Sequence, residues 1–213
     1  MIIIEDQNQL FLLIADKISK DIECVAFGGT AMMYKQYKNA TKDIDLVFFD
    51  LESRDEFARA IKKLGYKESN YLRSIYPKEK SKMKTAPLMY TRGDERFDLF
   101  VKNIFNIKVN ESIRQRSTDI RDFNGKKLLR LRILGDEDLI LLKAITSREG
   151  DFKDIEEICK NNPNIDWGVV VNEAINQGNL LIVIDLEEKM KKLEKEFFIK
   201  KKYFDRLYAF DKS

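Results

Sequence analysis

The chain has 213 residues, of which 44% are hydrophobic and 35% charged, a composition that excludes wholesale disorder. Its 39 Lys and Arg residues against 36 Asp and Glu leave a net charge of +3, so the overall charge does not indicate a nucleic-acid-binding protein. The absence of histidine excludes Ser–His–Asp triads, imidazole bases and His-ligated zinc. Any catalysis must therefore use carboxylates, Lys, Arg, Tyr, Ser or Thr, with metals bound by oxygen.

The sequence contains no pattern for secretion or for a membrane. Cys24 and Cys159 are far apart and lack metal-ligand spacing. Met1–Ile4 is followed at once by acidic and polar residues, unlike a signal peptide, and no stretch reaches the roughly 20 apolar residues that span a bilayer. We therefore expect a cytoplasmic protein that does not bind a membrane.

The first part of the chain mixes helix and strand patterns. Helical spacing predicts a helix within Asp6–Lys20, and the apolar run Cys24–Phe27 predicts a buried strand that ends at two glycines. The patterns that follow predict a helix over Thr30–Tyr37, a strand over Ile44–Phe49, and a helix from a Ser53/Glu56 capping box to Gly65. Short β-prone pieces at Leu72–Tyr76 and Leu88–Tyr90 then flank a lysine-rich turn at Lys78–Lys84. A strand over Glu95–Val101 comes next, and then a hairpin of Ile120–Phe123 and Leu128–Leu134 around Asn124-Gly125.

After Gly135 the patterns become helical. We expect helices over Asp136–Arg148, Asp151–Lys160 and Asp166–Gln177. The tail repeats apolar residues near a 3.5-residue period, which predicts a packing helix or a homodimer helix; they are Leu186, Met190, Leu193, Phe197, Phe204 and Leu207. The prediction is an α/β (α+β) domain over residues 1–134, with a mixed sheet flanked by helices, and a helical region over 135–213 packed on it.

A glycine turn links the first predicted strand to a helix. In Val25–Ala31 the strand ends at Gly28 and Gly29 before the helix begins. Such a turn lets the backbone approach a phosphate closely, and free N–H groups at a helix start attract anions. A tight strand–helix connection explains the same pattern without any ligand.

Paired carboxylates follow on the next strand. Residues two apart on a strand project from one face, so Asp43 and Asp45 lie side by side while Ile44 and Leu46 face the core. Two adjacent carboxylates repel each other near a core unless a cation lies between them. Oxygen ligands of this kind suit Mg²⁺ or Mn²⁺. Two surface aspartates in a solvated turn are the alternative.

A third carboxylate lies in the middle of a later strand. Asp98 stands between Phe97 and Leu99, where a charged residue is unusual because solvated aspartates prefer turns and strand ends. If this strand lies beside the first, Asp98 completes a three-carboxylate site for two metals that clamp the attacking and leaving oxygens of a phosphoryl displacement. Asp98 is also the candidate that accepts a proton from an attacking hydroxyl.

These motifs together resemble the polymerase-β-like nucleotidyltransferase superfamily, near the AbiEii-type toxins and minimal nucleotidyltransferases. The resemblance is carried by Gly28–Ala31, Thr41-x-Asp43-Ile-Asp45 and Phe97-Asp98-Leu99, within residues 22–50 and 94–101, and continues more loosely into Asp138–Lys143 and Arg148–Ile155. The sequence departs from that family's pattern at Asn39 and Ala40, where an Arg is often found.

The resemblance implies a nucleotidyltransferase fold, an NTP substrate and a toxin–antitoxin setting. It implies that the three aspartates bind the metals, that Gly28 and Gly29 hold the triphosphate, and that Lys143 contacts phosphate. Thr30 and Thr41 are the further candidates for nucleotide binding. For Lys143, a surface lysine at the end of an apolar helix is the alternative. For Arg148 with Asp151 or Asp154, the alternative is a salt-bridged helix junction.

Basic residues gather around the predicted hairpin, and they are the best candidates for a nucleic-acid-facing patch. They are Arg114, Arg116, Arg121, Lys126, Lys127, Arg130 and Arg132, against Asp119 and Asp122. A solvated, salt-bridged hairpin is the competing interpretation.

Three functions fit the sequence. The first is Mg²⁺-dependent transfer of a nucleoside monophosphate from an NTP to a hydroxyl of RNA, such as tRNA, or of a protein. The second is a non-catalytic nucleotidyltransferase-like binding or regulatory module of a toxin–antitoxin type system. The third is a nucleotidyltransferase that modifies a small molecule, which resembles enzymes that act on aminoglycosides.

Overall fold

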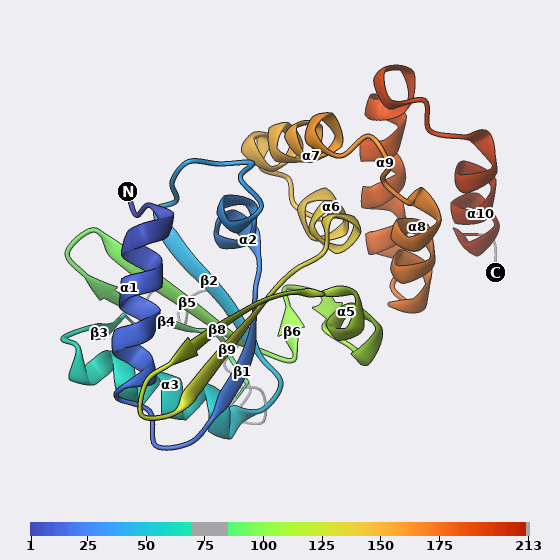
Figure 1. Ribbon diagram of the computed structural model, residues 1–213. Helices are drawn as coiled ribbons and strands as arrows, with labels where there is room; N and C mark the ends of the chain where they lie inside the picture. Colours follow the sequence, from blue (N-terminus) through green and yellow to red (C-terminus); the bar gives the residue numbers. More distant parts are fainter. Residues whose placement is uncertain (70–84, 212–213) are drawn as a thin grey trace. The chain divides into compact units, whose positions relative to one another are not determined.

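The computed structural model describes residues 1–69 and 85–211, so the expected pieces at Leu72–Tyr76 and Lys78–Lys84 lie outside the described residues. The chain divides into two compact units, Met1–Leu134 and Gly135–Ser213. Figure 1 shows a sheet with helices in the first unit and helices in the second. This is the expected fold class, α/β with a mixed sheet flanked by helices and a helical C-terminal part.

A single sheet organises the first unit, with strand order β3-β4-β5-β2-β1-β9-β8. Its two parallel pairs are β1 with β9 and β2 with β5, and its other pairs are antiparallel. The strands are β1 (Ile22–Ala26), β2 (Asp43–Phe48), β3 (Lys67–Ser69), β4 (Leu88–Arg92), β5 (Glu95–Val101), β8 (Asp119–Asn124) and β9 (Leu128–Ile133), with the short β6 (Asn103–Ile104) and β7 (Ile107–Lys108) beside β5.

In the described residues of this unit, the helices are α1 (Ile4–Ala15), α2 (Gly28–Tyr34), α3 (Leu51–Lys63) and α5 (Glu111–Arg116). Helix α1 packs against β8 and β9, whereas α3 packs against β1, β2 and β5. The core between these layers contains Ile44, Leu46 and Phe48 of β2, which are fully buried. This arrangement fixes β2 and β5 side by side in the middle of the sheet.

Two helix boundaries differ from those predicted. Helix α3 begins at Leu51 because Asp50, rather than Ser53, is the N-cap, and its carboxylate accepts a hydrogen bond from the Ser53 backbone N–H at 2.7 Å. Glu56 instead accepts a hydrogen bond from the Ser19 N–H. Helix α1 ends at Ala15, earlier than Lys20, because the chain turns there toward β1.

The predicted hairpin of β8 and β9 is confirmed, but its turn is longer than the two residues Asn124-Gly125. Asn124 pairs with Leu128, so residues 125–127 form the connection. A Cβ on Gly125 would lie 2.5 Å from the carbonyl carbon of Ala15. The glycine therefore lets the hairpin end approach the end of α1.

The second unit is built from α6 (Asp136–Ala144), α7 (Glu149–Asn161), α8 (Trp167–Asn176), α9 (Leu180–Phe197) and α10 (Lys201–Asp211). The periodic tail is divided between α9 and α10 by Phe198, which adopts the left-handed conformation with φ of 52°. Leu186, Met190 and Leu193 are buried against neighbouring helices of the same unit. The packing explanation for this period is therefore supported by the structure.

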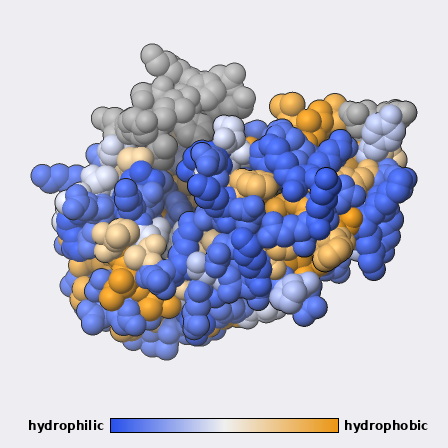
Figure 2. Space-filling model, turned by 90° about the horizontal axis from the view of Figure 1, so that it is seen from above, coloured by the Kyte–Doolittle hydropathy of each residue, from blue (hydrophilic) through white to orange (hydrophobic). Residues whose placement is uncertain are grey.

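In the described parts of the chain, no helix is both long and apolar enough to span a bilayer. Figure 2 shows one face as mostly hydrophilic, with separate apolar areas among the charged side chains.

Candidate active site

The two carboxylate motifs meet on adjacent strands. Strand β5 lies parallel to β2, with Asp45 opposite Asp98 and Asp43 opposite Arg96. Because alternate residues share a face of the sheet, these four side chains form one cluster on that face. The buried Ile44 on β2 and Phe97 on β5 point to the other face and hold both strands in the core. The structure thus places the three predicted aspartates on one face of two adjacent strands.

Arg96 is a member of this cluster that the sequence analysis missed. Its Nη2 lies 2.5 Å from Asp43 Oδ2 and 3.0 Å from Asp98 Oδ2, so one guanidinium nitrogen bridges two carboxylates. The signal was present in the sequence, because Arg96 lies two residues before Asp98 and must share its face. Its pairing with Asp43 depends on the register between β2 and β5.

Asp98 is the most buried of the three carboxylates, with 8% of its surface exposed. Burial raises the pKa of Asp98 to about 6; the Arg96 guanidinium lowers it and the Asp43 carboxylate raises it further. Its Oδ1 is buried and has no hydrogen-bond partner among the described residues. A buried carboxylate oxygen in this state has unused capacity to bind a cation or accept a proton.

The glycine turn lies directly against this cluster. Gly28 has φ of 56°, a conformation that glycine adopts without strain. A Cβ at this position would lie 2.5 Å from Asp45 Oδ2. Gly28 therefore both makes the turn into α2 and leaves room for the Asp45 carboxylate. The turn and the carboxylates belong to one site.

The two predicted threonines hold the backbone of the aspartate strand. The Asp45 N–H donates to Thr30 Oγ1 at 3.0 Å, and the Thr41 hydroxyl donates to the Asp43 carbonyl at 3.1 Å. A Cβ on Gly29 would lie 2.5 Å from Thr41 Oγ1. In this structure the hydroxyls of Thr30 and Thr41 therefore have a positioning role, and their predicted contact with a nucleotide stays a prediction.

Lys143 lies in the second unit, on α6. Its Nζ is 3.0 Å from Asp151 Oδ1 and 2.5 Å from Asp154 Oδ2. With 6% of its surface exposed, Lys143 is not a surface lysine as the alternative interpretation had it. Arg148 Nε lies 2.7 Å from Asp151 Oδ2, which confirms the salt-bridged helix junction. A phosphate contact by Lys143 stays a prediction.

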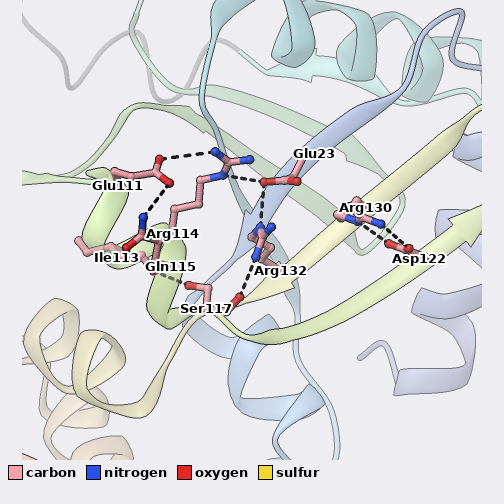
Figure 3. A network of polar contacts seen from close by, with 9 residues as sticks. All are labelled: Glu23, Glu111, Ile113, Arg114, Gln115, Ser117, Asp122, Arg130 and Arg132. Atoms are coloured by element: carbon pink, nitrogen blue, oxygen red, sulfur yellow. Dashed lines mark hydrogen bonds and ion pairs between the residues drawn. The ribbon is translucent and has the colours of Figure 1, made fainter.

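Three of the basic residues near the β8–β9 hairpin are paired with carboxylates, as Figure 3 shows: Arg114, Arg130 and Arg132. Glu23 on β1 accepts from Arg114 Nε and Arg132 Nε, both at 2.8 Å. Arg130 pairs with Asp122 at 2.7 Å on the hairpin itself. The salt-bridged interpretation of this patch is therefore confirmed for these arginines, which reduces their availability to nucleic acid.

The donor set suits a hard divalent cation, since it consists of carboxylate oxygens, one of them buried and unpartnered. Asp43, Asp45 and Asp98 are the residues that would bind such a cation. In the arrangement described, however, no three His, Cys, Asp or Glu side chains within residues 1–69 and 85–211 are grouped to hold a metal. The cation between Asp43 and Asp98 is the Arg96 guanidinium.

A mixed sheet with a glycine turn before a helix, two aspartates on a central strand and a third on the adjacent parallel strand defines a nucleotidyltransferase fold. The family model described as "Nucleotidyltransferase of unknown function" (DUF6036) matches residues 3–205, and the chain belongs to this family. No curated protein matches the sequence.

Proposed function

We propose that the protein transfers a nucleoside monophosphate from an NTP to a hydroxyl acceptor and releases pyrophosphate, with Mg²⁺ or Mn²⁺ as its metal. The observation that carries this proposal is the convergence of Asp43, Asp45 and Asp98 on one face of the sheet, against Gly28. Divalent cations held by these carboxylates would neutralise the charge on the attacking and leaving oxygens of the displacement.

The chain's own residues have separate roles in this proposal. Gly28 and Gly29 offer backbone without side chains for the triphosphate, and Thr30 and Thr41 hold the strand that carries the ligands. Asp98 accepts the proton of the acceptor hydroxyl. The hydroxyl oxygen then bonds to the α-phosphorus, while the bond to the bridging oxygen breaks and its electron pair leaves with pyrophosphate.

Asp98 is the best candidate for the base because it is the most buried of the three carboxylates. Without a metal, burial raises the pKa of Asp98 to about 6, which leaves the carboxylate mostly ionised at neutral pH; a cation bound to the same carboxylate would lower this pKa. A catalytic base works best when its pKa lies near the working pH. In a chain without histidine, a buried aspartate is one of the few groups that can reach this range.

RNA such as tRNA and a protein are the acceptors that we propose to test first. The paired arginines of the hairpin do not single out RNA. A relationship to AbiEii-type toxins, and with it a toxin–antitoxin role, rests on the motifs at Gly28, Asp43 and Asp98. Packing of the helical unit on the sheet unit and a homodimer through the tail also remain predictions.

A non-catalytic binding module is the second candidate, and Arg96 favours it. Three clustered carboxylates would be costly without a cation, but the Arg96 guanidinium already bridges Asp43 and Asp98. The cluster can therefore exist without a metal. Such a module would bind a partner and show no turnover.

A label-transfer experiment separates the two candidates. The protein is incubated with Mg²⁺ and each α-³²P-labelled NTP, with total tRNA, with lysate protein or with no acceptor. An Asp43→Asn/Asp45→Asn variant serves as control. We expect label on one acceptor class, lost in the variant. No label with any NTP from a folded protein would reject the enzyme and support the module.

A further inference from the structure

Arg96 occupies the position that a cation would take between two of the metal-binding carboxylates. Its Nη2 is 2.5 Å from Asp43 Oδ2 and 3.0 Å from Asp98 Oδ2. Divalent cations bind carboxylate oxygens at about 2.0–2.6 Å, so a cation shared by these same two oxygens would overlap this nitrogen. The guanidinium and such a cation cannot occupy the space between Asp43 and Asp98 together.

The contact made by Arg96 is also incomplete. Its Nε is buried and has no hydrogen-bond partner among the described residues, and Asp98 Oδ1 is in the same state. A buried donor and a buried acceptor left unpaired are unfavourable compared with a satisfied network. The arrangement therefore stabilises the carboxylates only in part.

Arg96 has a path out of the site. Its side chain is 35% exposed, compared with 11% for the side chain of Asp98. A long, partly exposed arginine can turn its charged head into water without moving the strand that carries it. The backbone of the aspartates stays in place because every residue of β2 pairs with β5.

We infer that Arg96 is an internal counter-ion that holds the place of a divalent cation between Asp43 and Asp98 and moves out when that cation binds. The inference rests on the proposed function, because it requires that these carboxylates bind a metal. Its consequence is that the wild-type protein binds the metal more weakly than its carboxylates alone would allow. Arg96 is a regulatory residue of the site in this account and not a ligand.

The test measures the direct binding of Mn²⁺ to the protein with no nucleotide present. Binding is monitored through the loss of the electron paramagnetic resonance signal of the free ion. Arg96→Gln removes the competing charge, and we expect its Kd for Mn²⁺ to fall at least about tenfold below that of wild type. Arg96→Lys keeps a positive charge and should stay closer to wild type. Lys42→Gln is the matched control. Lys42 is exposed and lies just before β2, and this substitution removes the same positive charge as Arg96→Gln.

Thermal unfolding provides a second measurement that does not depend on activity. In a chelator, Arg96→Gln should unfold at a lower temperature than wild type, because its carboxylates then repel one another. Added Mg²⁺ should raise its Tm by more than it raises the Tm of wild type. Lys42→Gln should show the wild-type response.

The outcomes separate this inference from the proposed function. If folded Arg96→Gln binds Mn²⁺ no tighter than wild type, while Asp45→Asn weakens binding, the counter-ion inference is wrong and the metal site stands. If neither wild type nor Arg96→Gln binds Mn²⁺ at millimolar concentration, both are rejected. Tighter binding by Arg96→Gln and unchanged binding by Lys42→Gln would support both.

Discussion

Two clusters in this protein combine buried carboxylates with a basic side chain, yet they differ in how completely their atoms are paired. In the second unit, Asp151 accepts from Lys143 through Oδ1 and from Thr146 and Arg148 through Oδ2, and Lys143 also pairs with Asp154. In the first unit, Asp98 has one oxygen on Arg96 and one without a partner among the described residues.

The pKa values of the two aspartates follow this difference. Burial raises the pKa of Asp98 to about 6 despite the neighbouring Arg96. Burial also acts upward on Asp151, but the hydrogen bond from Thr146 and the charge of Lys143 hold its pKa below the ordinary value. A fully paired carboxylate stabilises the fold, whereas an underpaired one keeps capacity for a ligand or a proton.

The largest expected effect comes from Asp98→Asn. If the first cluster is catalytic, label transfer should fall about a thousandfold, the equivalent of about 4 kcal/mol of transition-state stabilisation. Stability should change little, because the variant removes an ionised group that the fold pairs poorly. Asp94→Asn, an exposed change in the β4–β5 turn, is the control and should keep full activity. Undiminished transfer by folded Asp98→Asn would remove Asp98 from the mechanism.

The second-largest expected effect is a loss of stability when the Lys143 cluster of the second unit is disrupted. Lys143→Met leaves Asp154 without this ion pair and removes one partner of Asp151, so we expect the free energy of unfolding to fall by about 3 kcal/mol. Lys153→Met removes an exposed ion pair with Glu149 on α7 and should cost less than about 1 kcal/mol. Urea unfolding of both variants measures the difference. Equal losses would show that the buried cluster has no special role in stability.

A pair of glycine variants separates backbone strain from displacement of Asp45. Gly28 and Gly93 have nearly the same φ, 56° and 57°, so alanine should cost each about 1 kcal/mol in strain. A Cβ at Gly93 meets nothing within 4 Å, whereas at Gly28 it would lie 2.5 Å from Asp45 Oδ2. Urea unfolding and label transfer should show a similar stability loss in both variants, but a loss of activity only in Gly28→Ala.

The smallest effect is a pH dependence in the presence of a chelator. The folded-state pKa of Asp98 is raised to about 6 from 3.8, so the folded protein binds the proton first as pH falls. Asp98 therefore contributes stability that is present below about pH 4 and is lost as pH rises through about 6.

Between pH 7 and pH 5, wild type should gain about 1 kcal/mol relative to Asp98→Asn. Urea unfolding of both proteins at the two pH values measures this gain. A difference that stays constant over this range would contradict the raised pKa.

Local patterns were enough to predict most elements of this protein and to place Asp43, Asp45 and Asp98 on strands. Strand β5 was predicted with its correct bounds, because alternation along a strand is a property of consecutive residues. Asp43 and Asp45 were predicted to share a face for the same reason. Errors arose where a neighbour from elsewhere competes, as at Glu56, which accepts from the distant Ser19 N–H, and in the hairpin turn that packs against Ala15.

The sequence by itself determined the chemistry available to the candidate site: carboxylates on strands, no histidine, and glycines before a helix. The tertiary structure alone decided which charges meet. Arg96 and Asp43 are 53 residues apart in the sequence, and they lie opposite each other only because of the register between β2 and β5. Glu23 and Arg132 are 109 residues apart and form a hydrogen bond. Such contacts arise from strand order and burial, which no local period encodes, and they decide whether a charge remains available for a ligand.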